Sequence, residues 1–355
     1  MMIKKVNVTF LTKYKVIPIF FSLRPFLDLN TSKYVFKLTS SIKSCLRGRD
    51  KDILIILRLN ESVIKKHIAE FKQIYNKVII YDEHDSSALR YLSLMDEIDF
   101  YINKLTLKDL NEYKKYDPKM KLNRLYFQNK LIHNSNSNVA INEKKLISSW
   151  DLSLGLYPVF FGLSRISYIL MVLGLKKTGY KLGKSISQLA FNYFFKNSKI
   201  KIYDVFAVFS QHKKEDINYQ RKWLLDKYQN DSRFFMQKTN QWKYYKTISK
   251  SRITISPFGW GEICFRDYEA IFAKSLLFKP NMDIFEVSKS IFIPFETYIP
   301  FKWDMSDFGE LLEYYLNNDS EIKRITKNAY RVLMEFRDKS DEHALKILNR
   351  ITEGD

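Results

Sequence analysis

The sequence predicts an α/β fold of two doubly wound domains, each a parallel sheet with helices on its faces. One observation is the order of patterns in the second half: a β-rich run at Ile253–Ile255, a turn with two glycines, helical spacing over Glu262–Ala273, and an apolar run at Leu276–Pro280. Strand, helix and strand in this order form a βαβ unit. The first half repeats this plan over Asp52–Leu57, Glu61–Tyr75 and Lys77–Tyr81.

The composition favours a cored protein with anionic partners. The 355 residues suffice for two domains, and 46% of them are apolar, which argues against disorder. A net charge of +20 favours phosphorylated substrates or an anionic membrane surface. No nucleic-acid-binding motif accompanies the charge, so we expect no nucleic acid partner. Two cysteines, Cys45 and Cys264, form no disulfide framework and indicate a reducing compartment.

The remaining elements of the first half follow from local patterns. Val6–Leu11 resembles a first strand, and Met95–Tyr101 a short later one. We expect Leu105–Met120 to be a charged helix. The most apolar stretch, Leu152–Leu175, contains Pro158 and Arg165 and is predicted to be a buried or interfacial helical segment, not a membrane span.

The second half is expected to open a new sheet near residue 199. The predicted domains cover residues 1–196 and 197–336, and a C-terminal helix is predicted at 337–355. Strands are predicted at Ile200–Phe209, Arg233–Gln237 and Ile291–Pro294, and helices at Asn218–Tyr228, Trp242–Lys250, Phe308–Leu316, Ser320–Phe336 and His343–Ile351.

The turn after Ile255 carries candidate binding chemistry. Gly259 and Gly261 allow close approach of the backbone, and the N–H groups that open the following helix attract anions. Arg266 offers a fork of donors to a phosphate. Glu269, three residues on, shares its face and is suited to a ribose diol. The alternative is a surface Arg–Glu pair on an ordinary helix.

A polar cluster follows the strand at Lys77–Tyr81, reading Asp-Glu-His-Asp-Ser-Ser from residue 82. In open α/β sheets ligands gather at the carboxyl ends of strands, so the cluster lies where a site is expected. Asp85 or His84 could take a proton from an acceptor hydroxyl. Asp85 could instead cap the next helix. No second carboxylate cluster is found, so we expect no metal site.

The run SPFGWGEICFRDYEAIFAKSLLFKPNMD from Ser256, with TYIPFKWDMSD from Thr297, resembles the nucleotide-binding half of GT-B glycosyltransferases. More narrowly, it is similar to bacterial family 1/4-like enzymes that build surface polysaccharides. In that superfamily a helical glutamate holds the donor ribose, and the resemblance gives this role to Glu269, followed by Ala270. The sequence departs from the pattern at Lys274-Ser275, where a glycine is usual, and six residues, not seven, separate Glu262 from Glu269.

The resemblance implies a GT-B fold, with two Rossmann-like domains facing a cleft and the last helix, 337–355, returning to the first domain. It makes 1–196 the acceptor-side domain and 197–336 the nucleotide-sugar-binding domain. It implies sugar transfer from a nucleotide-sugar to a glycan or lipid-linked glycan acceptor of capsule, O-antigen or lipopolysaccharide type. The transfer would need no metal or cofactor. The protein would act in the bacterial cytoplasm, at the inner face of the membrane. The expected catalytic residues are Asp85 and Arg266. The expected donor-binding residues are Ser256, Gly259, Gly261, Glu262, Arg266, Glu269 and Lys279.

Three other functions are compatible with these patterns. The chain could be a nucleotide-sugar-binding module without activity, or a peripheral membrane scaffold that acts through its charge alone. It could also be an epimerase acting on a sugar nucleotide, since such an enzyme would use two similar domains.

Overall fold

The computed structural model describes residues 5–12, 18–47, 51–127, 141–149, 170, 176–196, 200–210, 214–286 and 291–353. Apart from Leu170, the predicted apolar segment 152–175 lies outside these ranges. None of the described helices combines the length and the apolar run needed to pass through a bilayer.

The first domain is a parallel sheet in the order β2-β1-β3-β4-β5-β7. Its central strands are continuous apolar runs because both faces of the sheet are covered. The strands are β1 (Val6–Thr12), β2 (Tyr34–Thr39), β3 (Lys51–Leu57), β4 (Tyr75–Asp82), β5 (Phe100–Asn103) and β7 (Leu146–Ser148). The helices are α1 (Pro18–Leu27), α2 (Ile42–Cys45), α3 (Glu61–Ile74), α4 (Leu122–Phe127) and α6 (Lys176–Phe191), with 3₁₀ turns at Leu92–Leu94 and Leu110–Lys115 and a π-helical turn at Asn192–Lys196.

The second domain is also a parallel sheet, in the order β13-β11-β10-β8-β9. Its predicted βαβ unit is present, because strand β10 continues through α9 into the neighbouring strand β11. The strands are β8 (Tyr203–Phe206), β9 (Phe234–Phe235), β10 (Ser251–Ile255), β11 (Leu276–Pro280) and β13 (Ile299–Phe301). The helices are α7 (Glu215–Tyr228), α8 (Gln241–Ile248), α9 (Phe265–Phe272) and α10 (Phe308–Leu316).

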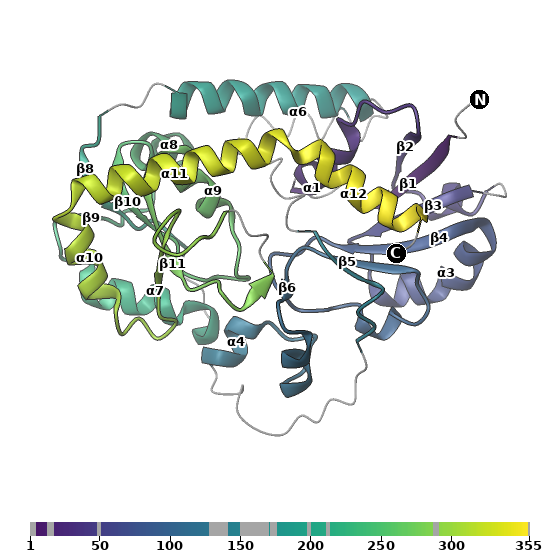
Figure 1. Ribbon diagram of the computed structural model, residues 1–355, viewed down its shortest axis with the longest axis horizontal. Helices are drawn as coiled ribbons and strands as arrows, with labels where there is room; N and C mark the ends of the chain where they lie inside the picture. The colour runs from purple at the N-terminus through teal and green to yellow at the C-terminus, as the bar shows by residue number, and fades with distance from the viewer. Residues whose placement is uncertain are drawn as a thin grey trace.

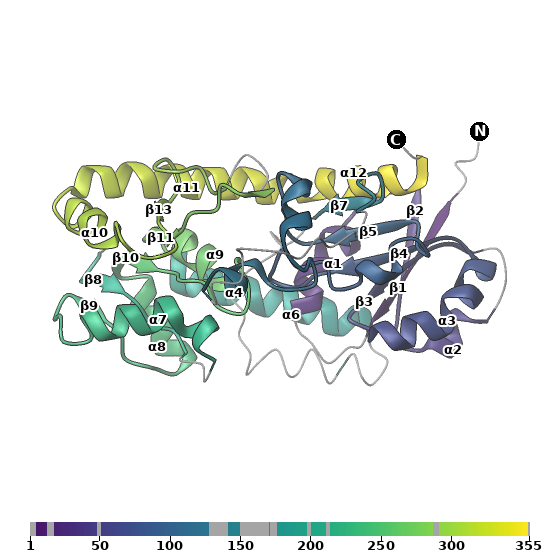
Figure 2. The ribbon, with the colours of Figure 1, turned by 90° about the horizontal axis from the view of Figure 1, so that it is seen from below.

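The last two helices lead the chain back to the first domain. Helices α11 (Asp319–Asp338) and α12 (Ser340–Glu353) continue nearly in line along one side of the molecule (Figures 1 and 2). Leu348 and its apolar neighbours on α12 join the first domain's core. The Tyr34 hydroxyl donates to Asn349 Oδ1 at 2.9 Å. Two Rossmann-like domains with a returning C-terminal helix are the GT-B arrangement, so the fold prediction is confirmed.

A short strand pair also joins the domains. Strand β6 (Thr106–Leu107) of the first domain pairs antiparallel with β12 (Phe285–Glu286) of the second. One hydrophobic cluster extends from the first sheet across this junction into the second domain. We call this contact zone the interdomain seam.

Two local predictions were wrong for identifiable reasons. Leu105–Met120 is not one helix, because buried Leu107 enters the interdomain strand pair and only a 3₁₀ turn follows it. Ile291–Pro294 is not a strand. The Thr297 hydroxyl takes the place of a strand partner there, accepting from the Ile293 N–H at 2.8 Å and donating to the Ile291 carbonyl.

Several predicted boundaries also moved. Strand β8 covers only residues 203–206 of the predicted Ile200–Phe209, and Ile200 and Ile202 are exposed. Strand β5 begins at Phe100 and not near Met95. Helix α9 begins at Phe265 and not at Glu262, because Asp267 accepts the Cys264 N–H at 2.9 Å and so caps the helix there.

Candidate functional site

The candidate site lies where the strand order of the second sheet reverses. Strands β8 and β10 are neighbours, while β9 lies on one side of them and β11 on the other. The loops that leave β8 and β10 therefore diverge and open a crevice at the carboxyl ends of the strands, the usual ligand position in such sheets. The turn at 256–262 leaves β10 at this point, and α7 and α9 bring two arginines to it.

Arg221 of α7 and Arg266 of α9 form a positive pair at this crevice. Arg221 Nη1 donates to the Ser210 carbonyl at 2.6 Å, and the Arg266 guanidinium lies 5.9 Å from the centre of the Phe209 ring. Buried Nε of Arg221, and buried Nε and Nη1 of Arg266, have no hydrogen-bond partner within the described ranges. Burial and the charge of Arg266 lower the pKa of Arg221 to about 10. Buried guanidinium groups in this state are suited to an anion.

Gly259 lies directly under Arg221. A Cβ built at Gly259 would overlap Nη2 of Arg221 and lie 3.4 Å from its Cζ. Asn123 Nδ2, from the first domain, donates to the Gly259 carbonyl at 3.0 Å. The glycine thus gives the guanidinium its position on the turn.

Gly261 faces the other domain. A Cβ at this position would overlap the backbone carbonyl of Asp85 and lie 2.8 Å from the Asp85 Cβ. The same carbonyl accepts the Ile263 N–H at 3.3 Å. The close approach expected at Gly261 is therefore made by the polar cluster after β4. The N–H groups of Ile263 and Cys264 are occupied, so within the described ranges the helix amides left for an anion are those of the first turn, at Phe265 and Arg266.

Glu269 is buried one turn beyond Arg266, with 9% of its surface exposed. Its oxygens accept from the hydroxyls of Tyr244 at 2.8 Å and Tyr245 at 3.0 Å, both on α8. Burial raises the pKa of Glu269. Burial by itself lowers the pKa of Arg266. The electrostatic interactions of its guanidinium group with Tyr244, Cys264 and Glu269 outweigh burial, so the pKa of Arg266 is raised. The predicted pair thus lies in one environment, with Tyr244 beside both groups.

Ser256 and Lys279, both predicted to bind the donor, belong to a buried network around Asp267. Ser256 Oγ donates to Asp267 Oδ1 at 2.6 Å, and Lys279 Nζ lies 2.9 Å from Oδ2. Lys279 also donates to the Glu262 carbonyl at 2.5 Å. The network joins the turn to the start of α9. In this structure the polar atoms of Ser256 and Lys279 contact protein groups of the network.

Glu262 links the two domains. Its buried side chain accepts the Ser87 N–H at 3.1 Å through Oε2, while the buried Oε1 has no partner in the described part of the chain. Burial raises the pKa of Glu262. The hydroxyls of Ser86 and Ser87 and Asn103 Oδ1 are buried without partners as well, again among the described residues. Polar groups in this state on both sides of the seam are suited to a polar ligand or ordered water.

Each carboxylate of the polar cluster has its own cation. Asp82 accepts two bonds from Arg90, at 2.6 and 3.1 Å. Glu83 pairs with Arg58. Asp85 Oδ1 lies 2.9 Å from Lys104 Nζ.

Asp85 is the carboxylate of this cluster that meets solvent. Its side chain is 51% exposed, against 1% or less for Asp82 and Glu83. Burial of part of the group raises its pKa, but Lys104 outweighs this and the pKa of Asp85 is lowered. Burial and the charge of Arg90 lower the pKa of His84 to about 4. Neutral His84 and ionised Asp85 are thus the accessible proton acceptors next to the turn at neutral pH.

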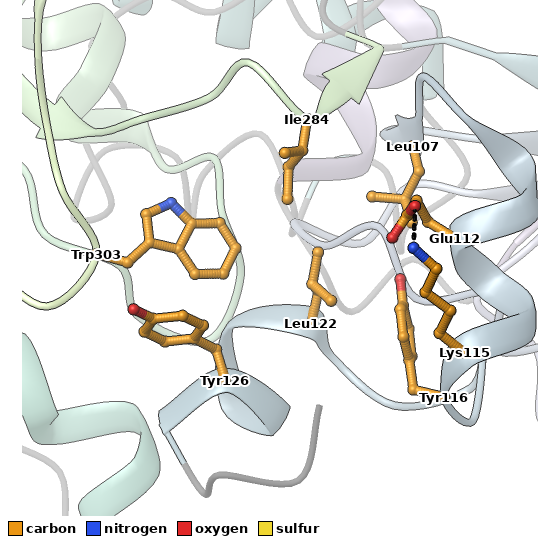
Figure 3. A pocket seen from close by; sticks show the side chains of 8 residues that line it. All are labelled: Leu107, Glu112, Lys115, Tyr116, Leu122, Tyr126, Ile284 and Trp303. Atoms are coloured by element: carbon orange, nitrogen blue, oxygen red, sulfur yellow. Dashed lines mark hydrogen bonds and ion pairs between the residues drawn. The ribbon is translucent and has the colours of Figure 1, made fainter. Parts of the chain in front are cut away.

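A largely apolar pocket of about 350 Å³ opens at the seam. Figure 3 shows Trp303 and Ile284 of the second domain facing Tyr126 and Leu122 of the first. The rings of Trp303 and Tyr126 meet edge to face at 5.0 Å. Trp303 also packs against Phe258, at 5.0 Å, so the pocket adjoins the turn. Leu107, Tyr116 and the ion-paired Glu112 and Lys115 complete the lining.

The structure brings the predicted residues together in part. Arg266 and Glu269 meet at the crevice, and Asp85 reaches the turn from the other domain. Sequence reasoning missed Arg221, whose local sequence is that of an ordinary charged helix. It also missed Gln220, which accepts the Phe258 N–H at 2.9 Å and donates to the Trp303 carbonyl at 2.9 Å. The spacing Cys264-x-x-Asp267 was a readable signal for the start of α9.

Comparisons with known proteins find similarity in structure and not in sequence. No family model matches the sequence, and no curated protein matches it. Among solved structures, Anabaena Alr3699/HepE in complex with UDP-glucose has a TM-score of 0.49 at 8% identity, over 97% of this chain and 99% of that one. A UDP-N-acetylglucosamine 2-epimerase has 0.44 at 10%, over 99% and 96%. A glycosyltransferase from Rickettsia africae ESF-5 has 0.41 at 10%, over 99% and 100%. A glycosyltransferase and an epimerase thus occur together among these similar structures.

Proposed function

We propose that the protein is a glycosyltransferase that takes a sugar from a nucleotide-sugar donor. The observation that carries the proposal is the Arg221–Arg266 pair, whose buried N–H groups lack partners among the described residues at the switch point of the second sheet. A diphosphate offers two negative groups and several acceptor oxygens to such a pair. The resemblance of the 256–283 region to nucleotide-binding halves of GT-B enzymes points in the same direction.

The donor would extend from the arginines toward α8. The diphosphate would lie between the guanidinium groups and the first-turn amides of α9. Glu269 would hold the ribose, because each of its oxygens accepts one tyrosine bond and retains capacity for another. The sugar would then face the seam, where Glu262 Oε1 and the serine hydroxyls have no partner in the described ranges.

The arginines would also carry most of the catalysis. When the bond between the sugar and the diphosphate breaks, negative charge grows on the leaving phosphate. Fixed guanidinium groups in a poorly solvated crevice stabilise that charge. Asp85 would take the proton of the acceptor hydroxyl, since it is ionised, half exposed and next to Gly261. No step in this scheme calls for a metal ion or cofactor.

The acceptor would enter from the first domain. The aromatic pocket between Trp303 and Tyr126 offers a flat, apolar wall beside the turn, to which a sugar ring or the lipid of a lipid-linked glycan could bind. We propose a surface-glycan acceptor of capsule, O-antigen or lipopolysaccharide type, and peripheral action at the inner face of a bacterial membrane. Support for this part is the resemblance, the net charge of +20 and the cysteine usage.

A donor panel tests the proposal. The purified protein is incubated with nucleotide-sugars and acceptor glycans, and the release of nucleoside diphosphate and the mass of the products are followed. A transferase gives an acceptor one sugar heavier. Conversion of the donor to an isomer would identify an epimerase, and binding without turnover a nucleotide-sugar-binding module. If no donor or nucleoside diphosphate binds, the proposal is wrong.

A further inference from the structure

An exposed cluster of large apolar side chains lies where the end of α6 and the turn after it pack against α8 of the second domain. Leu189 at the end of α6 is 68% exposed, Tyr193 one turn later 62%, and Trp242 at the start of α8 48%. The rings of Tyr193 and Trp242 are 5.0 Å apart and form one surface patch, and Leu189 lies one helical turn before Tyr193. Behind them, buried Phe194 meets Trp242 edge to face at 4.8 Å and holds its ring in place.

The two stretches of sequence that form this cluster carry charges of one sign. The sequence has no Asp or Glu between Asp151 and Asp204, the stretch that contains α6, and none between Asp231 and Glu262, the stretch that contains α8. Exposed lysines lie beside the cluster, with Lys181 on α6 and Lys243 and Lys246 on α8. An acid-free surface of this length is unusual in a chain with 39 acidic residues.

The exposed positions of α6 follow one line. Lys181, Ser185 and Leu189 are four residues apart, and Tyr193 continues the spacing, whereas Phe191 and Phe194 turn inward. Spacing of four keeps these side chains on one side of the helix. Figure 1 shows α6 along an outer edge of the molecule, where no other described element lies outside it. The line is therefore open to a large flat partner.

We propose that this face, made by α6, the turn after it and α8, binds the surface of an anionic lipid bilayer. Tyrosine and tryptophan side chains prefer the boundary between headgroups and acyl chains, and leucine adds apolar burial below them. The surrounding lysines attract acidic headgroups, and no carboxylate on these two stretches of sequence repels them. Nucleic acid or an acidic protein would also satisfy the lysines but would leave the cluster of Leu189, Tyr193 and Trp242 without a function. The inference names the face for the membrane contact in the proposed function, but it does not depend on the proposed transfer activity, since it uses none of the donor-site residues.

Sedimentation of the full chain with lipid vesicles tests this inference. We expect binding to phosphatidylcholine vesicles that contain phosphatidylglycerol, little binding to phosphatidylcholine alone, and weaker binding as salt rises. Tyr193→Ser with Trp242→Ser should lower the partition coefficient by about tenfold or more. Lys243→Gln with Lys246→Gln should lower it by roughly fivefold per lysine removed, and only on the acidic vesicles.

Matched substitutions on other faces serve as controls. Tyr314→Ser removes an aromatic side chain of similar exposure, 52%, from α10. Lys323→Gln with Lys327→Gln removes two exposed charges from α11. Both should leave vesicle binding unchanged. The lysine variants keep the test valid if loss of the two rings impairs folding, which thermal unfolding would reveal.

Three results would overturn the inference. One is equal loss of binding in the control variants, which would indicate an effect of net charge alone. Another is vesicle binding that survives all four substitutions in the face. The third is binding to heparin or RNA that the lysine substitutions weaken, with no binding of the protein to acidic vesicles.

Discussion

The backbone carbonyl of Asp85 lies directly against Gly261, so that the polar cluster of the first domain touches the candidate binding turn of the second. This contact makes the site a property of both domains. Three residues from other elements contact the turn: Gln220 of α7 at Phe258, Asn123 of the first domain at Gly259, and Asp85 at Gly261.

The two glycines of the turn should respond differently to alanine. Gly261→Ala places a methyl group on the Asp85 backbone, which cannot move aside alone, and we expect a loss of about 1–3 kcal/mol in the free energy of unfolding. Gly259→Ala displaces only the end of the Arg221 side chain. It should weaken nucleoside diphosphate binding with little change in stability. Urea unfolding and ligand titration measure the two effects.

Gly309 supplies the control for that comparison. It lies in α10, and a Cβ there would meet only ordinary contacts, at 3.5 Å from the Tyr228 hydroxyl and 3.7 Å from Lys227 Nζ. Gly309→Ala should leave stability unchanged or raise it by about 0.5–1 kcal/mol, because alanine favours the helix. Equal destabilisation by all three alanines would contradict the reasoning.

Lys279 should act on stability more than on binding. Lys279→Met removes the cation from buried Asp267, and a buried carboxylate left alone costs about 3–5 kcal/mol. Adding Asp267→Asn should recover part of that loss, since no charge then remains. Unfolding by urea of the single and double variants measures this. A fully stable Lys279→Met protein that fails to bind the donor would instead support a direct contact with the ligand.

Asp85 should set the acid limb of the pH–rate profile. Asp85→Asn should lower turnover by about 10²–10⁴-fold, as expected for a lost general base, and leave donor affinity nearly unchanged. Lys104→Met removes the ammonium that lowers the pKa of Asp85, so the acid limb should move to higher pH. An unmoved limb in the Lys104 variant would exclude Asp85 as the group that titrates.

Lys201 should give the protein a stability that rises with pH. Its ammonium donates to the carbonyls of Ser249 and Ala273, at the ends of α8 and α9, at 3.1 and 2.6 Å. Burial and the charge of Lys274 nevertheless lower its pKa from 10.5 to about 7. The unfolded chain binds the Lys201 proton more tightly than the folded chain does. The free-energy cost of burying the charged ammonium is therefore full below about pH 7, and it is relieved as the pH rises toward 10.5.

Comparison with Lys201→Met isolates this effect. The variant does not titrate at this position, so the difference in the free energy of unfolding, wild type minus variant, should increase between pH 7 and pH 9.5 or so. Chemical denaturation at a series of pH values measures the difference. A flat or falling difference would mean that the two carbonyls hold the ammonium more strongly than burial opposes it.

The sequence predicted those elements whose stability is local or periodic. Strands β3 and β4 are unbroken apolar runs, and α11 shows its buried face at helical spacing from Ile322 to Phe336. The two-residue strands β6 and β12 could not be predicted in this way, because each exists only through a partner that is distant in the sequence. Thr106 pairs with Glu286, and Leu107 pairs with Phe285.

The candidate site also divides into residues with a local sequence signal and residues that depend on distant partners. Arg266 and Glu269 could be proposed from their spacing on one helix. Arg221 could not, since it reaches the site only because β8 and β10 are neighbours and α7 follows β8. The buried network of Ser256, Asp267 and Lys279 was likewise beyond sequence reasoning, because a lysine on a strand gives no sign of its partner.

The most direct test of the account is calorimetric titration of a nucleoside diphosphate, chosen from a panel, into the wild type and into Arg221→Gln, Arg266→Gln and the double variant. Arg331→Gln, at an exposed ion pair on α11, is the control. We expect each single substitution to weaken binding by about 10–100-fold, the double variant to show no measurable binding, and the control to bind normally. Unchanged affinity in the double variant, with its fold intact, would contradict the central claim that this arginine pair binds the diphosphate.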